Sequence, residues 1–304
     1  MRPFFLRSRF AAGFQNAVYV WPASKGYYAE KAVPRRIDVR ARPADTAEEI
    51  VSRLPATVRA FLFHIDLTET GNYPLDRRGL IEKLKARSIR VLNAGVTSIA
   101  KRTLYDLARQ IGAPCLQATP DGDAQELLIA KTNRNYGGRN ERLLPRRDRR
   151  LLGMSEGSSH IRGAFDYKVL PRAHVPRSWW EDPDLVLERY ISNREHRFHR
   201  VHIVLDHFAF FSGVSSLQII KIRDCTDTRE YFLRRGEMSD MLPRTLLKAA
   251  YDFAEAFSLD FGALDFVADD TGGYYAIDVN ATPWRATESN ERFSFLQAAW
   301  NKIA

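Results

Sequence analysis

Cysteine is scarce in this sequence: Cys115 and Cys225 are the two examples among 304 residues. Two cysteines without a CxxC spacing exclude a disulfide framework and the common zinc and redox motifs. The sequence also lacks any run of about 18 apolar residues, the length that a membrane-spanning helix requires. We therefore expect a soluble protein of the reducing cytoplasm.

Several familiar nucleotide and metal motifs are missing as well. There is no GxxxxGK[ST] phosphate loop, no GxGxxG dinucleotide fingerprint and no HExxH zinc motif. The length of 304 residues is nevertheless enough for two or three packed units, and a hydrophobic content of 45% predicts a substantial core. These absences leave other kinds of nucleotide or metal site open.

Positive charge is abundant, with a net charge of +9. Such an excess predicts an anionic partner such as a nucleotide, an acidic substrate or a nucleic acid. It is concentrated between residues 134 and 177, where eleven Arg or Lys accompany four acids. We interpret this basic segment as a long mobile loop or flap. Its role is either a lid over a site or a solvated loop, and any nucleic acid is expected to bind here.

Short apolar runs alternate with helix-period segments over the first 93 residues. This alternation favours a small α/β domain with a largely parallel sheet. A possible cap for the first of its longer helices is Asp45. The expected strands are 17–21, 37–40, 61–65 and 89–92, and the expected helices are 46–54 and 76–86.

The rest of the chain mixes helices and strands without a repeat. An amphipathic helix is expected near residues 98–114, and a second, with apolar residues at helical spacing, at 242–257. Strands are expected at 127–131, 184–191 and 200–205, with a turn at Asp206 and His207.

A hairpin near the end of the chain carries the most informative pattern. In FGALDFVADDTGGYYAIDVNA, two strand-like runs flank the turn residues DDTGG. Asp278 and Asn280 are two residues apart on one strand, so their side chains leave the same face. Folding the hairpin places Asp265 opposite residue 277 or 278. This all-oxygen donor set suits Mg²⁺, with Mn²⁺ as an alternative. A polar hairpin end that satisfies backbone groups near Thr282 is the other interpretation.

The run FGALDF followed by YYAIDVNATPW resembles the end of the nucleotide site in the ATP-grasp superfamily, which includes D-alanine:D-alanine ligase and glutathione synthetase. The resemblance implies that Asp265, Asp278 and Asn280 hold Mg²⁺ against the phosphates of ATP. The family more often has Glu where this chain has Asp278. The implied fold is a small α/β domain (1–93) followed by two α+β lobes (94–187 and 188–304) that enclose a nucleotide site.

Further motifs follow the family order along the chain. Lys131 ends the strand LLIAK, where the family has a lysine that contacts phosphate or adenine, and Lys101 matches the first phosphate lysine, although Arg102 is adjacent. NYGGR resembles the flexible loop that covers the phosphates. The remaining implied nucleotide contacts are Gly137 and Gly138 in that loop, Glu188, Arg189, Tyr190 and Ile191 in the hinge strand LVLERYI, and Glu195 near the ribose.

The resemblance also implies catalytic residues and a reaction. Arg200 matches the arginine that neutralises the transferring phosphate, a task for which a charged planar fork is suited. Arg285, beside Trp284, lies where family members bind substrate, and Trp284 stands where a glycine is usual. The implied reaction activates a carboxylate as an acyl phosphate, which an amine or a thiol then attacks.

Three alternatives remain open from the sequence. The same fold also serves phosphotransferases, which stop after moving the phosphate, and a catalytically silent protein would keep the fold alone. The run RNERLLPRRDRR has six arginines and would suit an RNA-binding module, although it lacks a recognisable nucleic-acid motif. The identities of the substrates do not follow from the fold.

Overall fold

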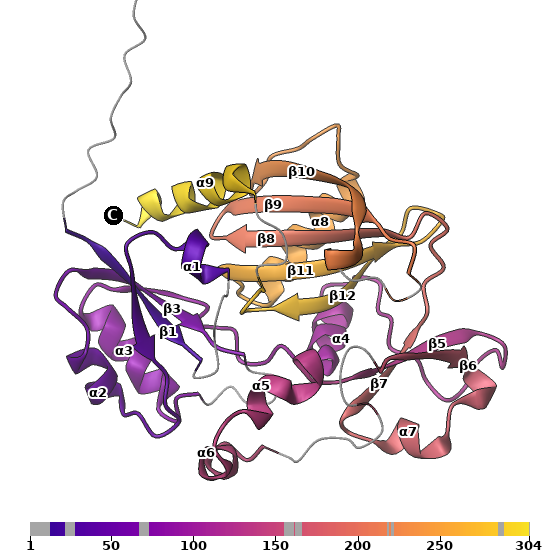
Figure 1. Cartoon of the computed structure of the whole chain (residues 1–304), viewed down its shortest axis with the longest axis horizontal. Coiled ribbons are helices and arrows are strands. Elements are labelled where there is room, and N and C mark those ends of the chain that lie inside the picture. The colour runs from indigo at the N-terminus through magenta and orange to yellow at the C-terminus, as the bar shows by residue number, and fades with distance from the viewer. Residues whose placement is uncertain are drawn as a thin grey trace, which may run out of the picture.

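The computed structural model contains three β-sheets with helices packed around them (Figure 1). It describes residues 13–21, 28–66, 73–154, 161, 166–217, 219, 222–284 and 289–303. In these ranges, none of the helices has both the length and the apolar character needed to cross a bilayer.

The first sheet is parallel, with the strand order β2-β1-β3-β4, as the alternating pattern of the first 93 residues predicts. β3 is buried along most of its length because helices cover both faces of the sheet. Its elements are β1 (Gln15–Val20), α1 (Ala29–Ala32), β2 (Arg36–Arg40), α2 (Ala47–Ser52), β3 (Val58–His64), α3 (Arg77–Ala86) and β4 (Arg90–Leu92).

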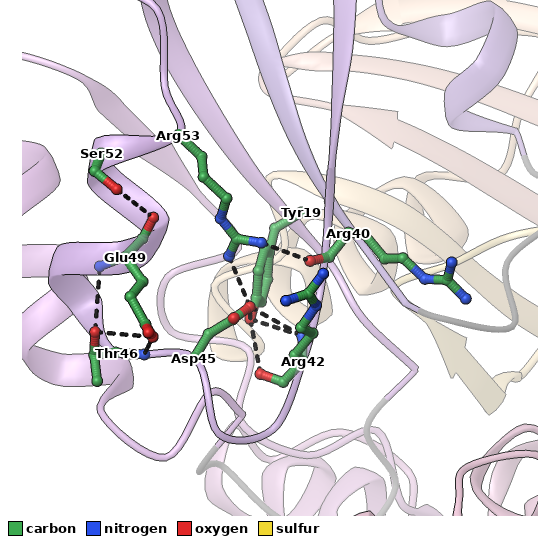
Figure 2. Close-up of polar contacts among 8 residues, drawn as sticks. All are labelled: Tyr19, Arg40, Arg42, Asp45, Thr46, Glu49, Ser52 and Arg53. Carbon is green, nitrogen blue, oxygen red and sulfur yellow. Dashed lines mark hydrogen bonds and ion pairs between the residues drawn. The ribbon is translucent and has the colours of Figure 1, made fainter.

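The start of α2 differs from the prediction. Thr46, and not Asp45, is the N-cap: its hydroxyl accepts from the backbone N–H of Glu49 at 3.2 Å, and the Glu49 carboxylate accepts from the Thr46 N–H at 2.8 Å (Figure 2). This reciprocal capping box satisfies two N–H groups that the helix leaves unpaired. Asp45 is buried instead and accepts from Arg53 at 2.7 Å and from the Tyr19 hydroxyl at 3.3 Å.

The second sheet is antiparallel, with the order β6-β5-β7. The described part of residues 134–177 forms short helices and a strand, so the prediction of one long loop is wrong there. Arg, Leu and Glu favour helix, and these residues dominate the two short α-helices of the segment. The elements are β5 (Leu127–Thr132), η1 (Asn135–Gly138), α5 (Arg139–Arg142), α6 (Arg146–Leu151), β6 (Lys168–Pro171), η2 (Arg172–His174), α7 (Arg177–Glu181) and β7 (Leu185–Arg189).

The third sheet has five antiparallel strands in the order β10-β9-β8-β11-β12. We did not predict β9 or β10, and His207 begins β9 although we expected it in a turn. β9 is buried at nearly every position, so it lacks the alternation that marks a half-buried strand. The elements are β8 (Arg197–Val204), β9 (His207–Val214), η3 (Ile222–Asp224), β10 (Thr226–Arg234), α8 (Arg244–Ala256), β11 (Phe261–Ala268), β12 (Tyr274–Asn280), α9 (Asn290–Ala298) and η4 (Ala299–Lys302).

The two faces of this third sheet differ in chemistry. One face packs against α8 and α4 (Lys101–Gln110) through a cluster that includes Val201, Leu264 and Phe253. On the opposite face, the middle of β8, β11 and β12 carries charged side chains. Burial of the first face therefore fixes the direction in which these charged groups point.

Asn93 ties the first sheet to the third. It follows β4 and is completely buried. Its side-chain oxygen accepts from the N–H groups of Asp260 and Phe261 at 2.9 and 3.0 Å, and its amide nitrogen donates to the Phe261 carbonyl at 2.8 Å. Its own backbone N–H donates to the Asp260 carboxylate at 2.8 Å. This clamp holds the carboxyl ends of β3 and β4 against the start of β11.

Replacement of Asn93 by glycine should destabilise the protein by about 2–4 kcal/mol, because buried backbone groups of Asp260 and Phe261 would lose their partners. The backbone of Asn93 has φ of 56°, which glycine adopts without strain, so the loss reports the side-chain contacts. Urea denaturation measures it. Ser88→Gly is the matched control, since Ser88 is exposed and has φ of 57°. Equal losses in the two variants would contradict a clamping role.

The three sheets occupy residues 15–92, 127–189 and 197–280 in turn. We propose them as the cores of three domains with boundaries near residues 93 and 187. β7 continues to Arg189, so the second sheet ends just after the second boundary.

Candidate active site

Three charged residues stand side by side on the polar face of the third sheet. In the strand register, Asp265 on β11 is directly opposite Arg200 on β8 and directly opposite Asp278 on β12. The hairpin prediction, which placed Asp265 opposite residue 277 or 278, is confirmed. The two carboxylates therefore occupy opposite positions on neighbouring strands, as binding of one shared ligand would require.

Arg200 and Asp265 form a bidentate ion pair. Nε and Nη2 of Arg200 donate to the two carboxylate oxygens of Asp265 at 2.6 Å each. The side chains are only 9% and 11% exposed. Such a fork-to-carboxylate pair fixes the orientation of both groups, and the same fork is able to bind a phosphate.

Lys101 brings a second cation to the carboxylates. It begins α4, and its Nζ donates to Asp278 at 3.0 Å. Burial alone would lower the pKa of the Lys101 ammonium group, but the charge of Asp278, with a smaller contribution from Glu188, raises this pKa above its usual value. Arg102 points elsewhere, to the carbonyl oxygens of Asp182 and Leu185. The two adjacent cations thus contact different parts of the protein, and Lys101 is the one that contacts the carboxylate hairpin.

Asn280 lies on the same strand as Asp278 but has a different environment. Its side-chain oxygen accepts from the N–H of Thr282 at 2.8 Å and from the Thr282 hydroxyl at 3.3 Å. The interpretation in which this hairpin end satisfies backbone groups near Thr282 therefore describes Asn280 rather than Asp278. Asn280 would have to release one of these contacts to bind a metal.

The donor set fits a hard divalent cation. The carboxylates of Asp265 and Asp278 are paired across the hairpin, and oxygen ligands of this kind suit Mg²⁺. Among the described residues, no three His, Cys, Asp or Glu side chains gather as a metal cluster. The hairpin supplies two carboxylates, and with the amide oxygen of Asn280 these make up the donor set expected from the sequence.

A second charged cluster lies within the three-stranded sheet. Nζ of Lys131 on β5 donates to Glu188 on β7 at 2.5 Å, and the Tyr105 hydroxyl donates to the same carboxylate at 2.6 Å. Glu188 is 1% exposed and Lys131 is 7% exposed. Because Tyr105 and Lys101 both belong to the first half of α4 and donate to Glu188 and Asp278, this cluster and the carboxylate hairpin adjoin the same helix.

The residues expected to form the hinge make hydrogen bonds and ion pairs within the protein. The N–H groups of Arg189 and Tyr190 donate within the protein, to the carbonyl oxygens of Leu116 and Leu127, each at 2.9 Å. Glu195 is exposed and forms an ion pair with Arg197 at 2.8 Å. Ile191 follows directly after this segment. Contacts of Arg189 or Tyr190 N–H groups with adenine would need a rearrangement of these backbone hydrogen bonds.

The glycine pair is part of a short helical turn. Gly137 and Gly138 lie in η1 and have φ of 65° and 70°. A Cβ atom on Gly138 would lie 2.8 Å from Cδ of Arg134, so a larger residue does not fit without movement. Arg134 is itself buried and pairs with Asp184 at 3.0 Å. The turn is thus anchored at its start, where we expected a flexible loop.

Asp66 is a polar residue of this region that we did not predict. It lies two residues after the end of β3, is 1% exposed, and accepts from the side-chain amides of Asn135, at 3.3 Å, and Asn140. Burial raises the pKa of Asp66 to about 6, and the charge of Asp278 acts in the same direction, while the two amides oppose it. A polar residue after the apolar run FLFHI, at the carboxyl end of a parallel strand, was the available signal.

This raised pKa predicts a pH dependence of stability. A carboxyl group with a higher pKa in the folded state binds its proton more tightly there, so its contribution is present below the unfolded pKa and is lost as the pH rises through about 6. Relative to Asp66→Asn, the wild type should therefore lose about 3 kcal/mol of unfolding free energy between about pH 4 and neutral pH. Urea denaturation at several pH values measures the difference, and a flat difference would contradict it.

Two expected substrate residues remain to be placed. Arg285 lies outside the described residues. Trp284, just before it, is 49% exposed. The indole is thus accessible beside the end of the carboxylate hairpin.

Comparison with solved structures reveals similarity over nearly the whole chain. A RiPP-associated ATP-grasp ligase from Chryseobacterium gregarium, in complex with ADP and a leader and core peptide, matches with a TM-score of 0.54 and 12% identity, over 96% of this chain and 98% of that one. An L-amino acid ligase from Bacillus licheniformis matches with a TM-score of 0.51 and 11% identity, over 95% of this chain and 74% of that one.

A D-alanine–D-alanine ligase from Bacillus anthracis, complexed with ATP, matches with a TM-score of 0.50 and 14% identity, over 95% of this chain and 97% of that one. By sequence, no protein-family model matches the chain and no curated protein matches it significantly. At these low identities the likeness concerns the arrangement of the backbone, and the chemistry has to be argued from the residues.

Proposed function

The chain has the ATP-grasp fold, and from this premise we propose that it is an ATP- and Mg²⁺-dependent ligase that joins a substrate carboxylate to an amine. One observation carries the proposal. Lys101 and Tyr105, about one turn apart on α4, donate to Asp278 and to Glu188, so the polar face of the third sheet and the Lys131–Glu188 pair meet at the same helix. A nucleoside triphosphate requires cations near its phosphates, and the metal that accompanies it requires carboxylates.

Each charged group has a proposed role. Asp265 and Asp278 hold Mg²⁺, with Asn280 as a further ligand, and this metal would withdraw charge from the phosphates. Lys101 and Lys131 bind phosphate oxygens, while Gly137 and Gly138 allow the backbone to approach them closely. In the present structure, acids of the protein neutralise both lysines, so nucleotide binding would exchange these partners for phosphates.

Arg200 is the proposed catalytic residue of the transfer step. Its fork would bind the transferring phosphate while the substrate carboxylate attacks phosphorus and ADP leaves. The product is an acyl phosphate, in which the carbonyl carbon is electrophilic. The nitrogen of an uncharged amine then forms a bond with this carbon, phosphate departs with the electron pair of the broken C–O bond, and the proton that the nitrogen loses passes to the departing phosphate or to water. We place Arg285 in the substrate pocket, and Glu188 to Ile191 and Glu195 around the adenosine.

The substrate is proposed as a small molecule or peptide that carries a carboxylate. The similar ligase from Chryseobacterium gregarium binds a leader and core peptide, and the one from Bacillus licheniformis is an L-amino acid ligase. We place the reaction in the cytoplasm, because neither Cys115 nor Cys225 forms a disulfide bond in the part of the chain that the structure describes.

The test is release of ADP from ATP and Mg²⁺ with panels of carboxylates, with and without amines. Hydroxylamine should trap the acyl phosphate as a hydroxamate of the activated carboxylate. A phosphotransferase would give a stable phosphorylated product and no hydroxamate, and a silent protein would release no ADP. Tight RNA binding with a steep dependence on salt, in place of turnover, would favour the nucleic-acid alternative.

A further inference from the structure

A buried carboxylate without a cationic partner calls for an explanation, and Asp66 is such a group. Among the residues that the structure describes, its partners are the side-chain amides of Asn135 and Asn140. Burial of a carboxylate is costly unless a cation or several hydrogen bonds compensate. Other buried acids of the described structure, such as Asp265 and Glu188, each have an Arg or a Lys.

The position of Asp66 in the first sheet is that of a ligand site. β1 is followed by β2 on one side and β3 lies on its other side, so the chain direction switches between β1 and β3. In open α/β sheets, ligands bind at the carboxyl ends of the strands at this switch point. Asp66 follows β3, and Trp21 follows β1 directly.

Hydrogen bonds connect the same position to the proposed reaction centre. Asn135, which donates to Asp66, lies two residues after Asn133, whose carbonyl oxygen accepts from the Lys101 N–H at 3.1 Å, and the side chain of Lys101 donates to Asp278. The clamp at Asn93 fixes this relation, because it joins the carboxyl ends of β3 and β4 to the start of β11. A ligand group held at Asp66 would therefore lie beside the metal hairpin.

Asn135 and Asn140 complete the polar surroundings. The amide group of Asn140 donates to Asp66, and its backbone carbonyl accepts from the Trp21 indole N–H at 3.4 Å. Each side-chain amide also carries an oxygen, which can face a donor after rotation of the amide. One carboxylate and two amide oxygens would together satisfy three N–H donors.

From this arrangement, and resting on the proposed function, we propose that Asp66 binds the ammonium group of the amine substrate, and that this substrate enters at the carboxyl ends of β1 and β3. An ammonium group presents three donors and one positive charge, which matches the carboxylate and the two amides. In the present structure the Asn140 amide occupies the place that the ammonium would take. A metal ion fits less well, because one carboxylate is a poor donor set for it.

A binding experiment without ATP tests this site directly. Isothermal titration with a panel of L-amino acid amides, each paired with its N-acetyl counterpart, compares ligands that differ in the ammonium charge. Asp66→Asn should weaken binding of the best amide about 10- to 100-fold and leave the acetylated compounds unchanged. Asp106→Asn, at an exposed acid on α4, is the control and should bind as the wild type does.

A kinetic readout separates recognition from activation. Hydroxylamine is uncharged near neutral pH and small, so hydroxamate formation should persist in Asp66→Asn while the KM for the amine rises. Loss of both reactions together, in a folded variant, would overturn the assignment. Equal binding of charged and acetylated ligands to the wild type would also overturn it.

Failure of the two proposals can be distinguished. If no carboxylate supports ADP release but amide binding still depends on Asp66, the ligase proposal fails and the ammonium site stands. If ADP release occurs and Asp66→Asn changes neither amide affinity nor the KM for the amine, the ligase stands and the ammonium site fails.

Discussion

Asp278→Asn is expected to lower the rate of ADP release about a thousandfold, because the change removes a proposed metal ligand and the counter-charge of Lys101 while it preserves shape. Asp278 contacts Lys101 at 3.0 Å and stands opposite Asp265 in the hairpin. The measurement is ADP release at saturating ATP and carboxylate. Titration of ADP with and without Mg²⁺ should show that the variant loses the contribution of the metal to nucleotide affinity.

Asp252→Asn is the control for this experiment. Asp252 lies on α8, on the far side of the third sheet, and pairs with Lys248 at the surface. Its activity should equal that of the wild type. A rate within about tenfold of the wild type for a folded Asp278→Asn protein would contradict the proposed metal site, since removal of a metal ligand costs more than that.

Glu188→Gln should destabilise the protein by about 3–5 kcal/mol, since it leaves the Lys131 charge buried without its counter-charge. Lys131 and Tyr105 both donate to this carboxylate, and Lys131 is buried. ATP should recover part of the lost melting temperature, because its phosphates would supply negative charge to Lys131. Thermal unfolding with and without nucleotide measures both effects.

The double variant Glu188→Gln with Lys131→Met tests the cause. Removal of both charges should be much less destabilising than removal of one, because no uncompensated ion remains. Glu181→Gln, at an exposed acid of α7, is the surface control. Additive losses in the double variant would show that the charge pair is not the source of the effect.

Much of the carboxylate hairpin could be predicted from the sequence because its information is local. Two runs of β-forming residues around DDTGG indicate a hairpin, and the spacing of two between Asp278 and Asn280 indicates a shared face. Those two facts placed Asp265 opposite residue 277 or 278, and the structure shows the pairing with Asp278. The contacts of the individual side chains could not be predicted in this way. Asn280, for example, contacts Thr282 through a turn whose geometry the pattern does not specify.

Long-range contacts account for most of what the sequence did not predict. Lys101 and Asp278 are separated by 177 positions, so their contact depends on how α4 packs on the third sheet. Arg134 belongs to the basic segment, for which a solvated loop was one interpretation. Its side chain is nevertheless buried, and Asp184 provides the counter-charge. Asp66 carries no motif, and its importance becomes visible only when β3 is placed beside β1.

Local alternatives account for the smaller errors. Asp45 and Thr46 are both good capping residues, and the choice between them depends on the buried contacts of Asp45 with Arg53 and Tyr19. β9 was missed because a strand buried on both faces loses the two-residue period.

The Asn93 clamp also affects how ligands could reach the proposed active site. Separating the first sheet from the third would break four hydrogen bonds of Asn93 at once, two buried and two partly buried, so we expect these two parts to move as a single rigid frame. Any breathing motion that admits a nucleotide then falls to the small sheet of β5, β6 and β7. The amine would bind within the rigid frame, and ATP between this frame and the small sheet, because its proposed contacts lie on both.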